Sequence, residues 1–396
     1  KFYGLRTMPF GVNFEYDYAC FNQVDNPRLE AIRLKVNRTL FQLREREVKK
    51  CIQEINPTFL FIDSLWSTDL IVFFPFLAGV KVAMIQTMMS TVVDEFHPPL
   101  NLGLQPDKAN FKRVAQKFYR QGYLKRLLDR IFFLGNDDMS AIRSLAKKNG
   151  VIDRYPLDLN RSFAIGYHRL PEFIVAPEEF EFFLGKKRKE QYYLGLQVYP
   201  FRKQPGFKKM AYRDLQGKGE VIIYVAFGSV RSENESEKNA ERFIEQLIQI
   251  AQRNPNWSIM IGYRGYEKFL DLVVSDNIFL FGYVPQLELL RICDVFITHG
   301  GLNSIKEGIY FHTPLLACPI DNNRFDLSSN AAKVVYHKLG KACFPGEGID
   351  SLEGKIRSLL TEHEYRGNLV NLKNTMDNKY TEEKVIEVIQ ALPMVL

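Results

Sequence analysis

Residues 295–304 read VFITHGGLNS, and this segment gives the strongest local indication of the fold class. Its first four residues form an apolar run typical of a buried strand, and two glycines separate that run from a helix predicted to start at about Ser304. Glycines at such a junction let backbone N–H groups approach a ligand closely, and a helix N-terminus favours an anion. The side chains of His299 and Asn303 can add further donors. The stretch therefore predicts a diphosphate site, although it has neither Walker nor GxGxxG spacing.

Apolar runs alternate with helical patterns on both sides of this stretch. The expected strands of the C-terminal half are residues 221–227, 257–263, 277–283, 295–298, 314–319 and 342–344, with helices over 237–253, from about 304, and over 329–339. In the N-terminal half we expect a charged helix over about 28–54 and strands at 58–62, 80–86, 162–167, 173–176 and 192–196. This alternation predicts α/β architecture with parallel sheets, which bind ligands at the carboxyl ends of their strands.

The chain divides into two expected domains. Residues 1–200 form the first and 220–378 the second; residues 201–219 lie in a Pro-, Gly- and Lys-rich linker, and residues 379–396 end the chain with a helix that we expect to pack back on the first domain. The sequence opens on Lys1 without Met, and no strand pattern precedes the first helix. We therefore expect the first strand and helix of the N-terminal domain to be missing from this sequence.

Composition narrows the class of protein. The 396 residues are 46% hydrophobic and 25% charged, and the net charge of +7 is spread along the chain rather than concentrated as in a nucleic-acid binder. Residues 186–189, KKRK, form the only dense basic run, which we interpret as a solvated loop, with contact to a membrane surface as the alternative.

The longest apolar run, residues 70–80, is too short to span a bilayer, so no stable membrane insertion is expected. The five cysteines are odd in number and lack metal-ligand spacing, which favours a reducing, cytoplasmic compartment.

The region downstream of residue 282 resembles a known signature. Its parts are Tyr283-Val284-Pro285-Gln286, Thr298-His299-Gly300-Gly301, Asn303-Ser304, Glu307, Pro314 and Pro319. Together they look like the nucleotide-sugar signature of family 1 glycosyltransferases, and their spacing is similar to that of bacterial macrolide and natural-product members. The resemblance implies a GT-B-like fold, with two Rossmann-like domains and a cleft between them.

The resemblance also implies roles for the residues that would bind the nucleoside. Tyr283 would stack on the base, and the backbone at Val284 and the side chain of Gln286 would hold the uracil. Glu307 would bind the ribose hydroxyls, which favours UDP over dTDP because a deoxyribose lacks one of them. Local pattern alone leaves Glu307 open, since Ser304-x-x-Glu307 also fits a capping box; the two roles need not exclude each other.

The diphosphate residues follow from the same resemblance. His299, Gly301, Asn303 and Ser304 would hold the diphosphate, and Ser229 would approach it from the opposite loop.

The expected sugar-reading positions depart from the family pattern. Asn323 and Arg324 stand where the family usually has Asp-Gln. A charged sugar such as a uronic acid would explain the arginine, as would a shifted register that lets Asp321 or Asp326 act, or a loss of activity.

The implied reaction is an inverting transfer from a UDP-sugar to a hydroxyl of a small lipophilic or aromatic acceptor, with no metal and no cofactor besides the sugar nucleotide. Asp63, after a predicted strand, fits the position that orients the family's catalytic His, and that His is not found in this chain. Met88, Phe96 and His97 are candidates for the acceptor pocket, His97 also as a substitute base. A nucleotide-sugar-binding protein without catalysis, or a two-domain nucleotide-sugar epimerase, is the alternative.

Overall fold

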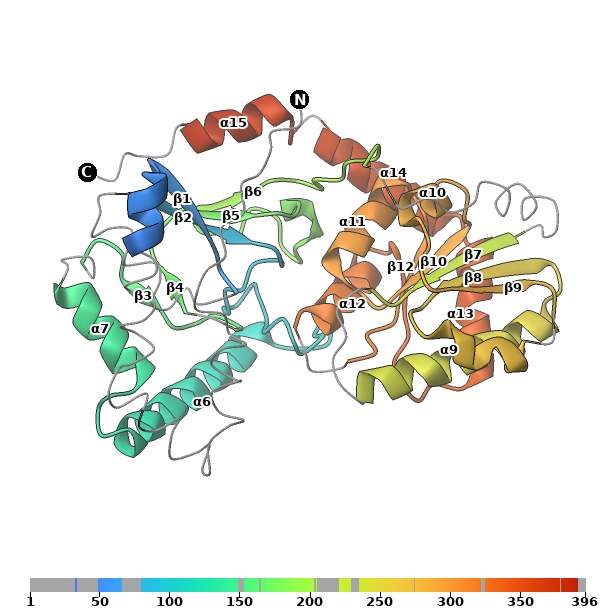
Figure 1. Ribbon diagram of the computed structural model, residues 1–396, viewed down its shortest axis with the longest axis horizontal. Helices are drawn as coiled ribbons and strands as arrows, with labels where there is room; N and C mark the ends of the chain where they lie inside the picture. Colours follow the sequence, from blue (N-terminus) through green and yellow to red (C-terminus); the bar gives the residue numbers. More distant parts are fainter. Residues whose placement is uncertain are drawn as a thin grey trace.

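The computed structural model describes residues 33, 49–65, 80–148, 153–163, 165–202, 204, 221–228, 235–273, 275–321, 325–377 and 379–390. These residues form two α/β units, each built around a parallel sheet (Figure 1). The two-unit α/β architecture predicted from the sequence is confirmed.

The C-terminal unit holds six parallel strands. They are β7 (Val221–Ala226), β8 (Trp257–Gly262), β9 (Ile278–Phe281), β10 (Val295–Thr298), β11 (Leu315–Ala317) and β12 (Gly340–Ala342). Every strand lies within or beside a predicted run, and their order is β12-β11-β10-β7-β8-β9. The chain order reverses between β7 and β10, and such a switch point is where open α/β sheets bind ligands.

Helices cover both faces of this sheet. They are α9 (Glu235–Arg253), η2 (Tyr266–Leu272), α10 (Gln286–Leu290), α11 (Leu302–Tyr310), α12 (Leu327–Tyr336), α13 (Ile349–Thr361) and α14 (Glu364–Asp377). Because side chains alternate along a strand, Ile223 and Val225 of β7 pack in the core under α9 and α13. Their neighbours Ile222 and Tyr224 pack in the opposite core, with α11, α12 and α14.

The N-terminal unit has a smaller described sheet. Its parallel strands, in the order β1-β2-β5-β6, are β1 (Phe59–Asp63), β2 (Lys81–Gln86), β5 (Glu172–Ile174) and β6 (Gln191–Tyr193). Among the described residues of the strand predicted at 162–167, only β4 (Gly166–Tyr167) is a strand, and it pairs antiparallel with β3 (Leu157–Asp158). Of the helix predicted over 28–54, Arg33 and residues 49–54 are described and helical.

Three helical segments of the N-terminal unit complete the described part. These are α6 (Phe111–Phe132), α7 (Asp138–Lys148) and the short η1 (Glu178–Phe180). Within the described residues, no helix combines the length and the apolar character needed to cross a bilayer.

The two units meet over a shared core. Met88, Ile174 and Phe180 of the first unit pack in one cluster with Ile305 and Ala331 of the second. The helices α11 and α12 therefore lie between the two sheets, as Figure 1 shows.

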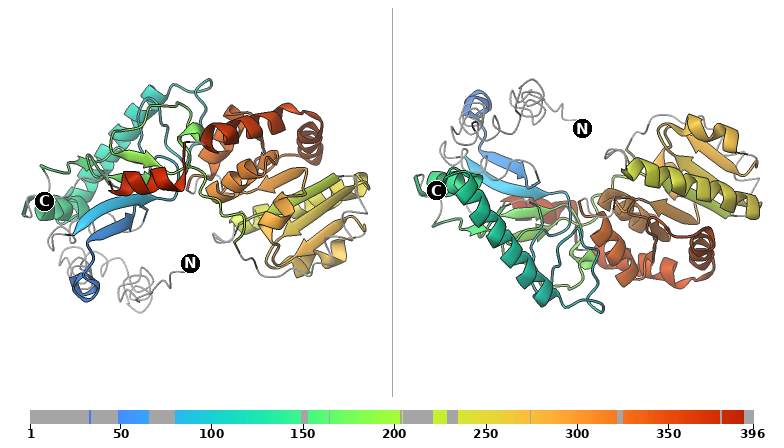
Figure 2. Two further views of the ribbon diagram at one scale, coloured as in Figure 1. Left: turned by 90° about the horizontal axis from the view of Figure 1, so that it is seen from above. Right: turned by 90° about the horizontal axis from the view of Figure 1, so that it is seen from below.

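The last helix, α15 (Glu382–Gln390), lies over the N-terminal sheet (Figure 2). Just before α15, the Tyr380 ring packs against Gly195, and the Tyr380 hydroxyl donates a hydrogen bond to a Glu179 carboxylate oxygen at 2.9 Å.

Candidate functional site

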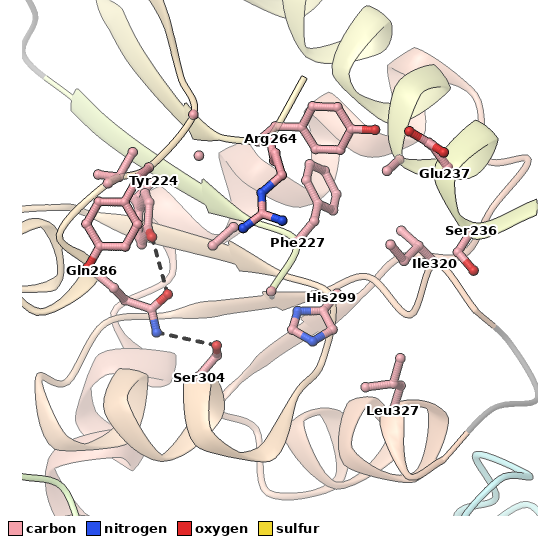
Figure 3. Close-up of a pocket in the computed structure, with 18 of the residues that line it drawn as sticks. Tyr224, Phe227, Ser236, Glu237, Arg264, Gln286, His299, Ser304, Ile320 and Leu327 are labelled. Carbon is pink, nitrogen blue, oxygen red and sulfur yellow. Dashed lines mark hydrogen bonds between the residues drawn. The ribbon is translucent and has the colours of Figure 1, made fainter. Parts of the chain in front are cut away.

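A cavity of 430 Å³ opens at the carboxyl edge of the C-terminal sheet (Figure 3). It is lined from the ends of β7, β8, β9, β10 and β11 and from the starts of α9, α10, α11 and α12, by residues that include Gly228, Tyr263, Tyr283, His299, Ile320, Ser236, Gln286, Ser304 and Leu327. The cavity thus contains the switch point between β7 and β10, where the fold alone predicts a ligand.

Glycines shape the floor of the cavity around His299. A Cβ on Gly228 would lie 2.5 Å from the His299 ring, and one on Gly301 would lie 2.7 Å from it. Gly228 also has φ of +77°, which disfavours a side chain. The imidazole therefore occupies the space that side chains at both positions would need, and Gly228 and His299 line the cavity together.

His299 is kept neutral in this setting. Burial lowers the pKa of His299 to about 4, against which a backbone hydrogen bond with Ala226 acts weakly. Its Nδ1 atom is fully enclosed and finds no hydrogen-bond partner within the described part of the chain. A buried polar atom without a partner is costly, so the position of this ring is maintained by the packing around it.

We expect His299 to make folding stability depend on pH. In the unfolded chain His299 has its ordinary pKa of 6.5, whereas in the folded chain its pKa is about 4. Between those values the unfolded state binds the additional proton, so the free energy of unfolding rises with pH from about 4 to 6.5 and this contribution is constant above. Urea unfolding at several pH values should show a shallower rise for His299→Gln; equal slopes in both proteins would contradict the assignment.

The two glycine loops that hold His299 form what we call the glycine cradle. A second polar cluster lies beside it and centres on Glu307 of α11. Its carboxylate is buried and accepts hydrogen bonds from Gln286 Nε2 at 2.5 Å and Arg202 Nη1 at 2.6 Å. Gln286 in turn accepts from the Tyr224 hydroxyl at 3.2 Å and donates to Ser304 Oγ at 3.4 Å (Figure 3). Gln286 and Arg202 line the cavity, and the Glu307 carboxylate is fixed directly behind them.

The structure does not place Glu307 in a capping box. Helix α11 begins at Leu302 with Gly301 as its N-cap and without a side-chain cap, so Ser304 already lies inside the helix. The carboxylate of Glu307 faces Gln286 and Arg202 instead of the helix N-terminus. The capping alternative is therefore wrong, because the helix starts two residues before the predicted position.

Tyr283 and Val284 line the cavity after β9. Tyr283 is 48% exposed, whereas Val284 is buried against Gly262.

Of the predicted donor residues that the structure describes, Gly301, Asn303 and Glu307 do not themselves line the cavity. Asn303 is exposed on α11 and does not line the cavity. Ser229, Asn323 and Arg324 lie outside the described residues. Of the two alternative carboxylates, Asp321 lines the cavity and accepts from Ser236 Oγ at 3.2 Å.

The other carboxylate, Asp326, has a structural environment. It is buried at the start of α12, where burial raises its pKa and Asn330 Nδ2 donates to it at 2.9 Å.

The N-terminal candidates are also apart from this cavity. Asp63 ends β1 and accepts a hydrogen bond from the Leu65 amide at 2.7 Å, which forms a local turn. Met88 is part of the shared core, and Phe96 packs on Phe183. His97 is buried, and its Nδ1 lies 2.9 Å from Asp94 Oδ1.

Several cavity residues were not found by sequence reasoning. Arg202 and Gln204 come from the linker, Tyr224 from the middle of β7, and Arg264 from the end of β8. The position of Arg264 directly after a predicted strand could have identified it. The linker residues carry no such signal, since nothing in their sequence indicates that they fold against α10, where Gln204 accepts from the Leu287 amide at 3.0 Å.

Known proteins match this part of the chain. Residues 198–382 match the family described as UDP-glucoronosyl and UDP-glucosyl transferase. An uncharacterized UDP-glucosyltransferase of Bacillus subtilis, YojK, is 27% identical over 174 residues, covering 44% of this chain and 37% of the relative. Human UDP-glucuronosyltransferase 2A3 is 28% identical over 162 residues, covering 40% of this chain and 28% of the relative. The matches thus span well under half the length of these relatives.

The fold match is more extensive than the sequence match. The crystal structure of the glycotransferase of kitacinnamycin superposes with a TM-score of 0.64 at 17% identity, covering 87% of this chain and 79% of that one. Its fold is GT-B, and the two parallel sheets of this chain follow it. The C-terminal half of the chain is therefore similar in sequence to UDP-glucosyl and UDP-glucuronosyl transferases, and both units share the GT-B fold.

Proposed function

We propose that this protein transfers a sugar from a UDP-sugar to a hydroxyl group of a small lipophilic or aromatic acceptor, with inversion at the anomeric carbon. The observation that carries the proposal is the pairing of two polar features in one cavity. The glycine cradle around His299 suits a diphosphate, and the Gln286–Glu307 pair suits a nucleoside.

The geometry supports a division of roles among the donor residues. A uracil stacked on the exposed Tyr283 would have Gln286 within its reach, and the ribose hydroxyls would donate to Glu307 in place of Arg202. The diphosphate would then lie toward His299 and the start of α11.

Charge that develops on the departing UDP would be stabilised by this arrangement. The N-terminus of α11 carries first-turn N–H groups and a positive dipole end, and Ser304 of this first turn lines the cavity together with His299. Donors fixed in advance toward a developing negative charge are the usual means of lowering such a barrier. We assign to Asp63 the orienting of the base that deprotonates the acceptor, and to Met88, Phe96 and His97 contacts with the acceptor.

The sugar would be read by residues 323 and 324. Asp321 and Phe325, which flank this segment, both line the cavity. Matched relatives include both glucosyl- and glucuronosyltransferases by name. We propose that Arg324 selects a carboxylate-bearing sugar, because a guanidinium pairs with a carboxylate through two parallel hydrogen bonds.

A donor panel tests both the activity and the sugar. The protein is incubated with UDP-glucose or UDP-glucuronate and hydroxylated aromatic acceptors, and products are identified by mass spectrometry and NMR. We expect a β-linked product from the α-linked donor, with UDP-glucuronate preferred. Arg324→Gln should lower that preference by roughly tenfold or more, since the charge pair is lost. Arg291→Gln, which alters an exposed arginine that does not line the cavity, should leave it unchanged.

Other outcomes of the panel would select the alternatives. Binding of UDP-sugar without product would favour a binding protein, and an epimerised UDP-sugar would favour an epimerase. An α-linked product would contradict inversion, and an unchanged donor preference in Arg324→Gln would remove the proposed role of Arg324.

A further inference from the structure

Helix α6 has an unusual orientation on the N-terminal unit. Its first half turns apolar residues inward, with Phe111 buried and Phe118 half-buried, but in its second half the inward residues are Gly122, Arg126 and Asp129, all only half-buried. Amphipathic helices of globular proteins normally turn their apolar side inward. Figures 1 and 2 show α6 along the outside of this unit.

The outward side of α6 is apolar. Tyr123, Leu124, Leu127, Leu128 and Ile131 are 58%, 56%, 42%, 57% and 64% exposed. Their spacing of three and four residues places them on one face, since a helix turns about 100° per residue. This face lies opposite the side formed by Gly122, Arg126 and Asp129. An exposed apolar row of this length on a described, continuous helix indicates a contact surface.

Basic side chains accompany this apolar face. The sequence of α6 contains seven Lys and Arg residues and one acidic residue, Asp129, while the whole chain has a net charge of +7. Six of the basic residues are exposed, namely Lys112, Arg113, Lys117, Arg120, Lys125 and Arg130. The exposed charge of the helix is therefore of one sign.

More basic residues lie near the N-terminal end of the helix. Phe111, the first residue of α6, packs on Phe183, whose neighbour Phe96 lies under the Lys186 ammonium group at 4.8 Å. The basic run that Lys186 begins is thus adjacent to α6 in space. Two of its members are partly neutralised, since Lys187 pairs with Glu178 and Arg188 with Asp158.

We propose that α6 binds the protein to the surface of an anionic lipid bilayer. The row from Tyr123 to Ile131 would lie at the border of the acyl chains, and Lys125 and Arg130 would reach anionic headgroups while their aliphatic stems cover apolar surface. Charge decides between this occupant and a second copy of the chain, because two copies would bring two strongly basic helices together. An anionic headgroup layer instead complements both the apolar row and the basic flanks.

Vesicle flotation of the whole chain tests the proposal. The protein should float with vesicles that contain phosphatidylglycerol in phosphatidylcholine, bind phosphatidylcholine alone weakly, and be released by added salt. Leu124→Asp/Leu128→Asp should reduce binding to the anionic vesicles by about tenfold or more, since two charges would enter the apolar layer. A matched pair, Leu270→Asp/Leu272→Asp, alters equally exposed leucines of the C-terminal unit and should leave binding intact.

Each other outcome would overturn the proposal. Absence of the parent from anionic vesicles, or equal losses in both variant pairs, would exclude a lipid-binding role for this face. A dimer in light scattering that Leu124→Asp/Leu128→Asp abolishes would identify a second copy as the occupant. UDP affinity, measured by calorimetry, should be the same in parent and α6 variant, so this result is independent of the proposed reaction.

Discussion

Glu307→Ala is expected to lower the affinity for UDP by roughly 100-fold, measured by isothermal titration calorimetry. A hydrogen bond to a charged group contributes about 1.5–3 kcal/mol, and a buried carboxylate that accepts from two ribose hydroxyls would exceed the lower figure. In the nucleotide-free protein this carboxylate is satisfied by Gln286 and Arg202. The Arg202 side chain is 45% exposed, so it can leave for solvent when a ribose arrives.

A change of ligand makes the test specific for the ribose. The parent should bind UDP more tightly than 2′-deoxy-UDP, and Glu307→Ala should lose this preference, because the group that reads the 2′-hydroxyl is absent. Arg202→Ala should bind UDP at least as tightly as the parent, since the ribose no longer has to displace an ion pair. A control, Glu347→Ala, removes a carboxylate that is paired with Lys355 and does not line the cavity, and it should leave UDP affinity unchanged.

The ribose role would be disproved by a particular combination of results. If Glu307→Ala lowers the melting temperature while UDP affinity and the preference over 2′-deoxy-UDP stay at parental values, Glu307 serves only the contacts with Gln286 and Arg202.

The C-terminal unit was predictable because its signals are local. Each strand of its sheet is a short apolar run bounded by helices. The HGG sequence at residues 299–301 marks both the end of a strand and the start of a helix. Because parallel strands place their carboxyl ends along one edge, residues as distant as Gly228 and His299 could be expected at one site. The structure places the His299 ring against Gly228.

The N-terminal unit was less predictable because its interactions are long-range. Of the strand predicted at 162–167 only Gly166–Tyr167 forms, and the preceding Arg161 is held by buried ion pairs with Asp158 and Glu172. The apolar residues of α6 have the spacing of a buried face, and the sequence does not reveal that this face points outward. Likewise, no local pattern links Arg202 to Glu307, which is 105 residues away.

The contact between the two units could not be predicted either, and it contains a buried ion pair. Lys333 of α12 lies 3.3 Å from a Glu181 carboxylate oxygen, and both side chains are almost fully buried, at 1% and 3% exposure. Glu181 also accepts from the Tyr193 hydroxyl at 2.8 Å and from the Ser90 amide at 3.0 Å. Burial by itself would raise the pKa of Glu181, but Lys333, His97 and these hydrogen bonds hold it below the ordinary value of 4.5.

We expect Lys333→Met to destabilise the protein by about 3–5 kcal/mol in urea unfolding, because it leaves a buried carboxylate without its cation. Adding Glu181→Gln should recover most of this loss, since glutamine keeps an oxygen that can accept from Tyr193 and Ser90 without carrying charge. Lys338→Met, which removes an exposed cation paired with Glu364 just past the end of the same helix, should change stability little.

The dependence on pH separates an electrostatic cause from lost packing. In the parent, the lowered pKa of Glu181 gives stability that is present above the ordinary value of 4.5 and is lost as pH falls through the folded-state pKa. In Lys333→Met the same carboxyl would titrate above its ordinary value, so it becomes neutral earlier as pH falls. The difference between the two proteins should therefore be large at pH 7 and shrink below pH 4.5. A difference that stays constant with pH, or that Glu181→Gln does not reduce, would mean that Lys333 stabilises the contact through packing on Phe182 and not through its charge.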